Sequence, residues 1–337
     1  MRGSLCTFFC MLVVSVALPQ DQHVVIGFWN VENLFDTVDD PMKNDDEFTP
    51  RGKNGWTSER YKKKLERLSS VIAGLGSPEA RNGPAVIGMC EVENGAALDD
   101  LLRTPALSRT GYRAVHHEGP DERGIDVCLI YDPKRFVVDR TVSCRVLLPD
   151  EKKKTRDILL ADGVLAGERM AILVNHWPSR RGGEKATRSL RLAAAQVLRR
   201  ICDSLFLADS TRAIIVMGDF NDDPSAASVK NTLRTGDDPE KVPATNFYNP
   251  MAALFRRGVG SIAWNDRWNL FDQILLSPHL CDGKGLSYRK AAVCNESFMR
   301  AEEGNFKGYP FRTFSGGVYT GGYSDHFPVV VFLSKKR

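Results

Sequence analysis

The feature of this sequence that most constrains its fold is a series of short apolar segments, separated by polar stretches rich in turn residues. Most segments are no longer than a strand and contain many β-branched side chains, a composition typical of strands buried between two packed sheets. The segments are residues 24–29, 85–90, 127–131, 135–148, 158–165, 170–174, 213–217, 270–276 and 328–333. The series therefore predicts a core made of two sheets packed face to face.

Longer segments with helical periodicity interrupt this series. Residues 184–207 repeat apolar side chains at helical spacing, as do residues 58–75, where Ser58 is the expected N-cap. A third helix is expected at residues 96–107. Strands with helices packed outside them predict a layered α/β sandwich. A chain of 337 residues has room for one or two domains, but no internal repeat or low-complexity block divides it, so we expect a single domain over residues 21–337.

Residues 1–20 have the pattern of an export signal peptide. Arg2 supplies a short basic region before the apolar residues 5–18, and Ser15 and Ala17 then offer a cleavage site. The apolar run is too short for a comfortable membrane span, so we expect no stable membrane anchor and a periplasmic or secreted protein. A buried first strand or an uncleaved anchor is the alternative.

Net charge and cysteine spacing disfavour two classes of protein. The 46 basic and 42 acidic residues leave a net charge of +4, too even a balance to indicate nucleic-acid binding by itself. Beyond the signal the cysteines occur singly, at positions 90, 128, 144, 202, 281 and 294. Because no C-x-x-C spacing occurs, zinc binding through thiolates is disfavoured. Disulfide pairing and buried free thiols both remain open.

Clusters of polar side chains stand where several apolar segments end or begin. They are residues 29–33 (W-N-V-E-N), 89–94 (M-C-E-V-E-N), 175–179 (N-H-W-P-S), 218–222 (G-D-F-N-D), 268–273 (W-N-L-F-D-Q) and 324–326 (S-D-H). Aspartate and glutamate are rarely buried unless they are paired or bind a metal. A single such carboxylate could simply cap a turn or a helix, but the whole series indicates one shared polar site.

The ordered set of these motifs resembles that of the endonuclease/exonuclease/phosphatase superfamily, which includes the DNase I-like nucleases. The resemblance covers nearly the whole chain, from about residue 24 to residue 333, and the motifs are specific in combination. It implies a four-layer α/β sandwich in which two mainly antiparallel β-sheets pack face to face with helices outside. It also implies an active site for phosphate esters at one edge of the sheets.

The resemblance assigns a metal site to four of these residues. Glu91 is expected to be the principal ligand of a divalent cation, helped by Asn30 and Glu32 and also by Asp325. Oxygen ligands of this kind suit Mg²⁺ or Mn²⁺ and disfavour zinc.

The catalytic roles also follow from the resemblance. Asp219 is expected to align or deprotonate the attacking water, and Asn221 to bond a phosphate oxygen. His326, oriented by Asp272, is expected to stabilise the transition state or to act as acid and base, which suits an imidazole whose tautomer a carboxylate fixes. His176 matches the second histidine of the DNase I-like pattern.

Three further residues are predicted to bind the substrate phosphate. Arg180 follows the N-H-W-P-S motif closely, and a guanidinium can bind phosphate oxygens with two parallel hydrogen bonds. Asn175, the first residue of that motif, is assigned to the same phosphate. Arg123 is placed in an outer ring of the site, although a turn closed by an Arg–Asp ion pair explains it equally well.

The polar loops between the segments carry less specific signals. The loop over residues 36–47 holds six acidic side chains, and a second calcium or magnesium site is conceivable there, but its spacing does not match an EF-hand and favours a solvated loop. The stretches 37–57, 237–262 and 303–322 are long, and long loops in compact domains often carry function.

Together these residues predict an exported, divalent-metal-dependent phosphoesterase that hydrolyses P–O bonds by in-line attack of water. A phosphodiesterase or endonuclease is favoured, because His176 stands where DNase I-like members carry theirs. The expected partner is a phosphate-ester substrate, with nucleic acid among the options. The lack of coiled-coil heptads and assembly repeats predicts a monomer.

Other functions are weighed against this one. Sphingomyelinase-like or inositol-phosphate phosphatase activity would use the same site. A non-catalytic binding protein on this fold would be expected to have lost some of the motif residues, and all are present. A glycosidase could use Glu91 and Asp219 as its two carboxylates, but the histidines would then have no role.

Overall fold

The computed structural model describes residues 22–78 and 83–335, so the expected export signal at residues 1–20 lies outside the described part. The first sheet has the strand order β14-β17-β1-β2-β4-β3. Its strands are β1 (Gln22–Leu34), β2 (Val86–Val92), β3 (Arg113–His116), β4 (Asp126–Tyr131), β14 (Leu286–Val293) and β17 (Val329–Lys335). Neighbouring strands are antiparallel except for β1 and β2, which are parallel.

The second sheet has the order β5-β6-β7-β8-β13-β10-β9. Its strands are β5 (Phe136–Cys144), β6 (Ile158–Leu165), β7 (Glu168–His176), β8 (Ala213–Asp219), β9 (Thr235–Gly236), β10 (Phe247–Tyr248) and β13 (Asp272–Leu276). Only the pairs β7–β8 and β9–β10 are parallel. Both sheets are therefore mainly antiparallel, as the family resemblance implies.

The core lies between the two sheets. Ile26 and Leu129 from the first sheet belong to one buried apolar cluster with Ile172 and Ile215 from the second. Since successive side chains of a strand point to opposite faces, the alternate residues of the same strands pack outward against helices. This face-to-face packing confirms the predicted sandwich.

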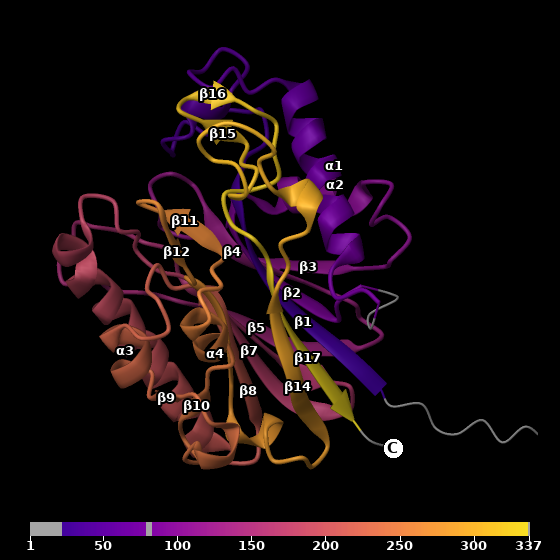
Figure 1. Ribbon diagram of the computed structural model, residues 1–337, viewed down its shortest axis with the longest axis vertical. Coiled ribbons are helices and arrows are strands. Elements are labelled where there is room, and N and C mark those ends of the chain that lie inside the picture. The colour runs from indigo at the N-terminus through magenta and orange to yellow at the C-terminus, as the bar shows by residue number, and fades with distance from the viewer. Residues whose placement is uncertain (1–21, 79–82, 336–337) are drawn as a thin grey trace, which may run out of the picture.

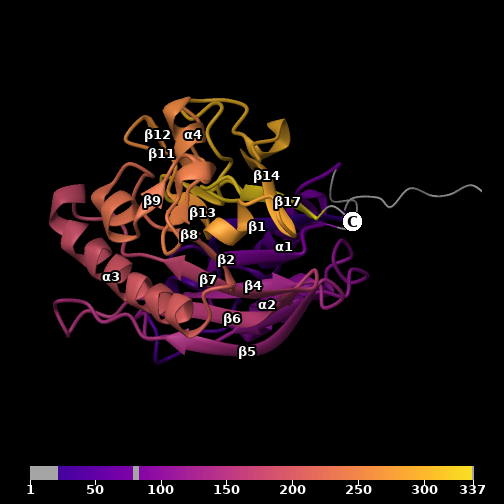
Figure 2. The ribbon, with the colours of Figure 1, turned by 90° about the horizontal axis from the view of Figure 1, so that it is seen from below.

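Helices cover the outer faces of both sheets and complete the four layers (Figure 1). The helices α1 (Ser58–Gly74) and α2 (Gly95–Arg103) pack on the first sheet, where Leu68 and Leu98 share a cluster with Ile87. The helix α3 (Glu184–Ala208) lies along the second sheet, as Figure 2 also shows, and Leu198 packs there with Val216.

Short elements fill the connections. They are α4 (Met251–Arg256), the small strands β11 (Ile262–Trp264), β12 (Arg267–Asn269), β15 (Phe314–Ser315) and β16 (Val318–Tyr319), the 3-10 turns at Asp46–Phe48, Pro239–Lys241, Pro278–Leu280 and Ser297–Met299, and a π-helical turn at Ser228–Thr232. None of the helices within residues 22–78 and 83–335 is both long and apolar enough to cross a membrane.

Three details differ from the sequence-based expectations or resolve them. The N-cap of α1 is Thr57 and not Ser58, because the Thr57 side chain accepts a hydrogen bond from the amide of Arg60. The strands β3 and β14 carry basic and polar residues, so the apolar series does not include them. The six cysteines of the described residues are all free thiols.

Candidate active site

The predicted polar clusters meet at one edge of the two sheets. Within the parallel pair β1–β2, Asn30 pairs with Cys90, and within the parallel pair β7–β8, His176 pairs with Asp219. The antiparallel strand β13 begins at the same place, where Asp272 pairs with Asp219. Because parallel strands end at the same edge of a sheet, these pairings bring distant motifs together.

The backbone of this edge is held in an unusual conformation. Glu32, Glu91 and Asn221 have φ angles of 51°, 64° and 49°, in the left-handed region that residues other than glycine rarely adopt. The registers of the β1–β2 and β2–β4 pairings also shift there, so both strands bend. Such conformations cost free energy and concentrate at functional sites.

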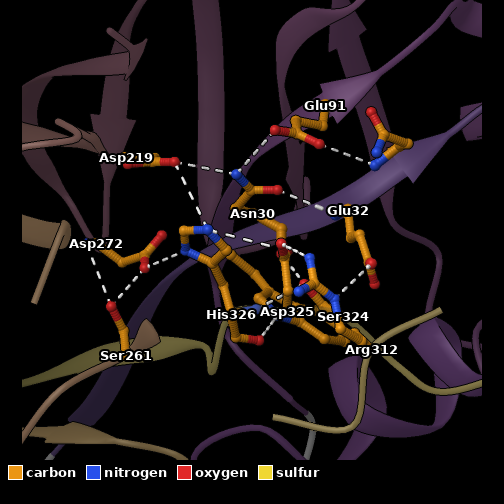
Figure 3. A network of polar contacts seen from close by, with 12 residues as sticks. Asn30, Glu32, Glu91, Asp219, Ser261, Asp272, Arg312, Ser324, Asp325 and His326 are labelled. Atoms are coloured by element: carbon orange, nitrogen blue, oxygen red, sulfur yellow. Dashed lines mark hydrogen bonds and ion pairs between the residues drawn. The ribbon is translucent and has the colours of Figure 1, made fainter. Parts of the chain in front are cut away.

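Asn30 holds two carboxylates together at the centre of the site (Figure 3). Its Nδ2 lies 3.3 Å from Glu91 Oε1 and 3.0 Å from Asp219 Oδ2. Its Oδ1 accepts a hydrogen bond from the amide of Glu32, and Glu91 Oε2 accepts another from the amide of Asn33. In this arrangement Asn30 positions Glu91 and Asp219 with its amide nitrogen, and its ligation of a metal stays a prediction.

Asp219 is the most central carboxylate of the site. Its Oδ1 accepts a hydrogen bond of 2.9 Å from the amide of Asn221, and its Oδ2 lies 3.7 Å from His176 Nε2 and 3.9 Å from His326 Nε2. Burial raises the pKa of Asp219 to about 7, against the opposing effect of His326. A carboxyl group with such a pKa can accept and release a proton near neutral pH.

His326 is oriented by a buried carboxylate. Its Nδ1 lies 2.6 Å from Asp272 Oδ2, which also accepts a hydrogen bond of 2.5 Å from Ser261 Oγ. Burial disfavours the charged imidazole, but Asp272, together with Asp219 and Asp325, outweighs this effect and the pKa of His326 rises well above its ordinary value. These carboxylates therefore favour the protonated imidazole, whose Nε2 lies on the side of Asp219.

His176 has the opposite character. Burial, with Arg156 second, holds the pKa of His176 well below its usual range and so favours the neutral imidazole. Its Nε2 lies 3.8 Å from Glu91 Oε1. The pKa values of the two histidines that flank Asp219 are thus shifted in opposite directions.

The loop that carries Asp325 and His326 is tied to β1. Ser324 Oγ donates a hydrogen bond to the carbonyl of Asn30 at 2.6 Å and accepts one from the amide of His326 at 3.0 Å. The indole of Trp29 donates to the carbonyl of His326 at 2.9 Å. These contacts join residues almost three hundred positions apart and fix the imidazole relative to Asn30.

Glu32 lies behind the site instead of within its cavity. Its carboxylate accepts a hydrogen bond from the amide of Thr313 at 2.6 Å and lies 3.6 Å from the guanidinium of Arg312. Burial, with Asp325 next, raises the pKa of Glu32 to about 7. Arg312 in turn lies 2.7 Å from Asp325, so the structure links Glu32 to the cavity through Arg312 and leaves its metal ligation a prediction.

The predicted phosphate-binding residues differ in their surroundings. Asn175 is fully buried, its amide donates to the carbonyls of Leu173 and Met217, and it does not line the cavity. Arg180 lines the cavity, but its guanidinium lies 3.3 Å from Asp222 and stacks on a phenylalanine ring. Phosphate contacts from these two residues stay predictions.

Arg123 is half-exposed on the cavity wall. Its turn is closed by Asp121, whose Oδ1 accepts a hydrogen bond from the amide of Arg123 and lies 3.8 Å from Nε of the same arginine, as the turn alternative expects. Asp126 faces His116, with 3.4 Å between Oδ2 and Nε2. The Arg123 side chain also lines the cavity, and its contact with a substrate phosphate stays a prediction.

The cavity at this edge has a volume of about 490 Å³. Its lining includes the predicted residues Asn30, Glu91, Arg123, His176, Arg180, Asp219, Asn221, Asp325 and His326. The carboxylates of Glu91, Asp219 and Asp325 offer hard oxygens, which fits Mg²⁺ or Mn²⁺. Cys90 does not line this cavity, although its Sγ lies within 4.8 Å of ligand atoms of His176 and Asp219.

Several residues of the site are absent from the sequence-based prediction. Arg156 lines the cavity and bonds Asp121 and the carbonyl of Trp177, while Ser261 supports Asp272. Arg312 lies in a loop that the sequence marks only as long and polar. Isolated arginines and serines in irregular segments carry no periodic signal, so only the fold reveals them.

The acidic loop after β1 forms a separate cavity beside the site. Asp36, Asp40, Glu93 and Glu118 line it, and Asp45 lies buried next to them. Burial, with Asp36 and Asp45 adding to it, raises the pKa of Glu93 to about 8. The fold therefore favours the protonated form of Glu93.

This pKa predicts a pH-dependent stability. The protonated Glu93 stabilises the fold fully below the ordinary pKa of 4.5, and this contribution is lost as the pH rises through about 8. We expect Glu93→Gln, which copies the neutral form, to be more stable than the parent at pH 8 by on the order of 2 kcal/mol, with little difference at pH 5. Urea unfolding at both pH values in EDTA measures this, with the exposed Glu240→Gln as control. Equal pH dependence in parent and Glu93→Gln would contradict it.

The fold and the cavity define an α/β-sandwich protein with one acid–base site at the edge of its sheets. A family model described as the endonuclease/exonuclease/phosphatase family matches residues 25–335. The chain belongs to this family of phosphoesterases. A sequence search of curated proteins found no match.

Solved structures share the fold at low sequence identity. An endonuclease/exonuclease/phosphatase family protein from Bacteroides thetaiotaomicron is 15% identical, with 94% of this chain and 99% of that chain covered and a TM-score of 0.58. D. rerio TDP2 complexed with a single-strand DNA product is 15% identical, with 93% and 99% covered and a TM-score of 0.56. A mannosyl-6-phosphatase from B. thetaiotaomicron is 15% identical, with 92% and 99% covered and a TM-score of 0.55. The fold thus occurs in proteins with different substrates.

Proposed function

We propose that this protein is a divalent-metal-dependent phosphoesterase that cleaves phosphodiesters by attack of water. The observation that carries the proposal is the placement of Asp219, whose buried carboxylate, with a pKa raised to about 7, lies between His326, whose pKa is raised, and His176, whose pKa is lowered. This combination provides a base and an acid in one cavity. The family supports the reaction class.

The residues that would hold the metal lie on the Glu91 side of the cavity. Glu91 and Asp325 supply carboxylates, and Asn30 lies beside them. Mg²⁺ or Mn²⁺ bound there would polarise a phosphoryl oxygen of the substrate. The hydrogen bonds from Asn30 and the amide of Asn33 fix the Glu91 carboxylate, so the ligand is oriented before a metal binds.

The remaining steps use the side chains of the chain itself. Asp219 orients the attacking water and accepts its proton, while the amide of Asn221 and Nδ2 of Asn30 hold the carboxylate in place. The imidazolium of His326, held by Asp272, donates a hydrogen bond to a phosphoryl or leaving-group oxygen. No covalent bond between enzyme and substrate is needed.

A diester is favoured over a monoester by the shape of the site. The cavity continues past Trp264 and Asp325 into a second one, so both substituents of the phosphate have room. Arg123 and Arg181 on the wall can bind the phosphate charge. Sphingomyelinase-like and inositol-phosphate phosphatase activities would use the same groups and remain the alternatives.

A pair of simple substrates tests the preference. With Mg²⁺ or Mn²⁺ we expect hydrolysis of bis(p-nitrophenyl) phosphate with a higher kcat/KM than that of p-nitrophenyl phosphate, because the site accommodates two substituents. Release of p-nitrophenol measures both rates. Faster hydrolysis of the monoester would instead make the protein a phosphatase.

We also propose, from the sequence alone, that residues 1–20 direct export to the periplasm or the medium and that the enzyme acts as a monomer. N-terminal sequencing of the exported protein and its mass in solution test these two points. An intact N-terminus or a dimer would overturn the corresponding proposal.

A further inference from the structure

Exposed aromatic side chains gather near the candidate active site. Among the large hydrophobic residues exposed in the described part of the chain, the aromatic ones are Trp264, Trp268, Phe298 and Phe306, with exposures of 37% to 53%. In the sequence they all lie in β11 or between β11 and β15. Figure 1 shows β15 and β16 at one end of the molecule. Single exposed hydrophobic residues are common, but a group of aromatic rings marks an interaction site.

The rings of Trp264, Phe298 and Phe306 line two cavities that continue from the active site. The catalytic cavity shares Ile262, Trp264 and Asp325 with a second cavity of about 310 Å³. The second shares Phe306 and Arg312 with a third of about 540 Å³. We call the second and third cavities together the aromatic groove. It leads away from the carboxylates that would act on a phosphate.

The far part of the aromatic groove combines flat rings with cations. The guanidinium of Arg67 lies 4.4 Å from the ring centre of Tyr323 and 5.5 Å from that of Phe311. The ring of Phe298 lies 5.5 Å from Tyr323, and Arg300 is exposed on the same wall. Such a wall offers planar groups for stacking and positive charge for phosphates.

We propose that the aromatic groove binds the unpaired nucleotides of a single-stranded nucleic acid whose scissile phosphate lies in the catalytic cavity, an inference that rests on the proposed phosphodiesterase function. Bases stack on aromatic and guanidinium planes only when their faces are free, which a duplex prevents. The groove thus selects single strands without a broad basic surface, in agreement with the small net charge of +4.

A lipid surface fits the groove less well. Rings that insert into a membrane project from the surface, whereas Phe298 and Phe306 line a hollow. Glu302 and Glu303 line the same hollow, and their charges would oppose an anionic bilayer. Between stacked nucleotides and an inserted hairpin, the concave shape and mixed charge favour the nucleotides.

Binding of a labelled oligothymidylate in EDTA, measured by fluorescence anisotropy, tests the proposal without cleavage. We expect Phe298→Ala and Phe306→Ala each to weaken binding by roughly 5-fold or more, and the double variant further, because each base loses a stacking partner. Leu207→Ala, at a 90% exposed position at the end of α3, is the matched control and should leave the affinity unchanged. Thermal unfolding of each variant verifies the fold.

The possible outcomes separate this inference from the proposed function. Equal oligothymidylate affinity in the double variant and Leu207→Ala, or tighter binding of a duplex, would overturn the inference. The inference would also be overturned if the parent protein bound phosphatidylcholine–phosphatidylserine vesicles and the double variant lost this binding while it kept its affinity for oligothymidylate. Hydrolysis of bis(p-nitrophenyl) phosphate with Mg²⁺ is measured in parallel on the parent protein. Its absence, with ring-dependent oligothymidylate binding retained, would defeat the proposed function and leave a single-strand-binding groove.

Discussion

Replacing Asp219 by asparagine is expected to lower kcat for bis(p-nitrophenyl) phosphate by at least roughly 100-fold, the usual loss when a general base is removed. The amide cannot accept the proton of the attacking water, although it has nearly the same shape as the carboxylate. It keeps an oxygen that can accept from the amide of Asn221. It also removes a buried carboxyl group, so the fold should survive.

Steady-state kinetics and thermal unfolding of the Asp219→Asn variant measure these two expectations together. Asp99→Asn is the control, since Asp99 is an exposed residue of α2 that pairs with Arg103 on the surface. The control should keep both kcat and melting temperature. Unchanged turnover in Asp219→Asn would show that another group activates the water.

Replacing Glu91 by glutamine is expected to raise the Mg²⁺ concentration needed for half-maximal activity by roughly 10-fold or more, because a hard dication depends on charged oxygen ligands. The amide of Asn33 can still bond the side-chain oxygen, so the local geometry is largely preserved. Excess Mg²⁺ should restore part of the activity. A change in the proton-transfer group, in contrast, would not respond to metal.

A Mg²⁺ titration of activity in Glu91→Gln and in the parent protein makes this comparison. The exposed Glu240→Gln serves as control and should follow the parent curve. If Glu91→Gln and the parent protein need the same Mg²⁺ concentration for half-maximal activity, and only the maximal rate is lower, Glu91 is not a metal ligand.

The sequence predicts the layers of the fold and the main residues of the site because both depend on local patterns. Buried strands are marked by apolar runs, and the motifs at their ends lie at one sheet edge once the pairing is known. Asn30 and Asp219 are 189 positions apart, and their hydrogen bond follows from strand order and not from any local signal. The family resemblance supplies this order in advance.

Other features need the three-dimensional structure. The sequence places Glu32 with the metal ligands, but the left-handed backbone at Glu32 turns its carboxylate toward Arg312 and Thr313. Arg180 is predicted to bind phosphate, yet nearby carboxylates engage its guanidinium. In both cases the direction of a side chain depends on contacts with distant segments, which spacing along the chain does not encode.

The aromatic groove also depends on contacts between segments that are distant in the sequence. Trp264 ends the short strand β11, Phe298 lies in a 3-10 turn and Tyr323 lies in a loop, and no periodicity predicts their mutual position. The sequence indicates only that the long loops near them are places where function resides. Their arrangement around a hollow that opens from the catalytic cavity follows from the structure.

The most direct test of the account is the metal dependence of bis(p-nitrophenyl) phosphate hydrolysis, followed through removal of metal by EDTA and its return as excess Mg²⁺ or Mn²⁺. The account predicts that activity disappears in EDTA and returns with either metal, while Asp219→Asn stays inactive throughout. Hydrolysis that persists in EDTA, or that Asp219→Asn retains with metal present, would contradict the assignment of Glu91 and Asp219 to a metal-assisted phosphodiesterase.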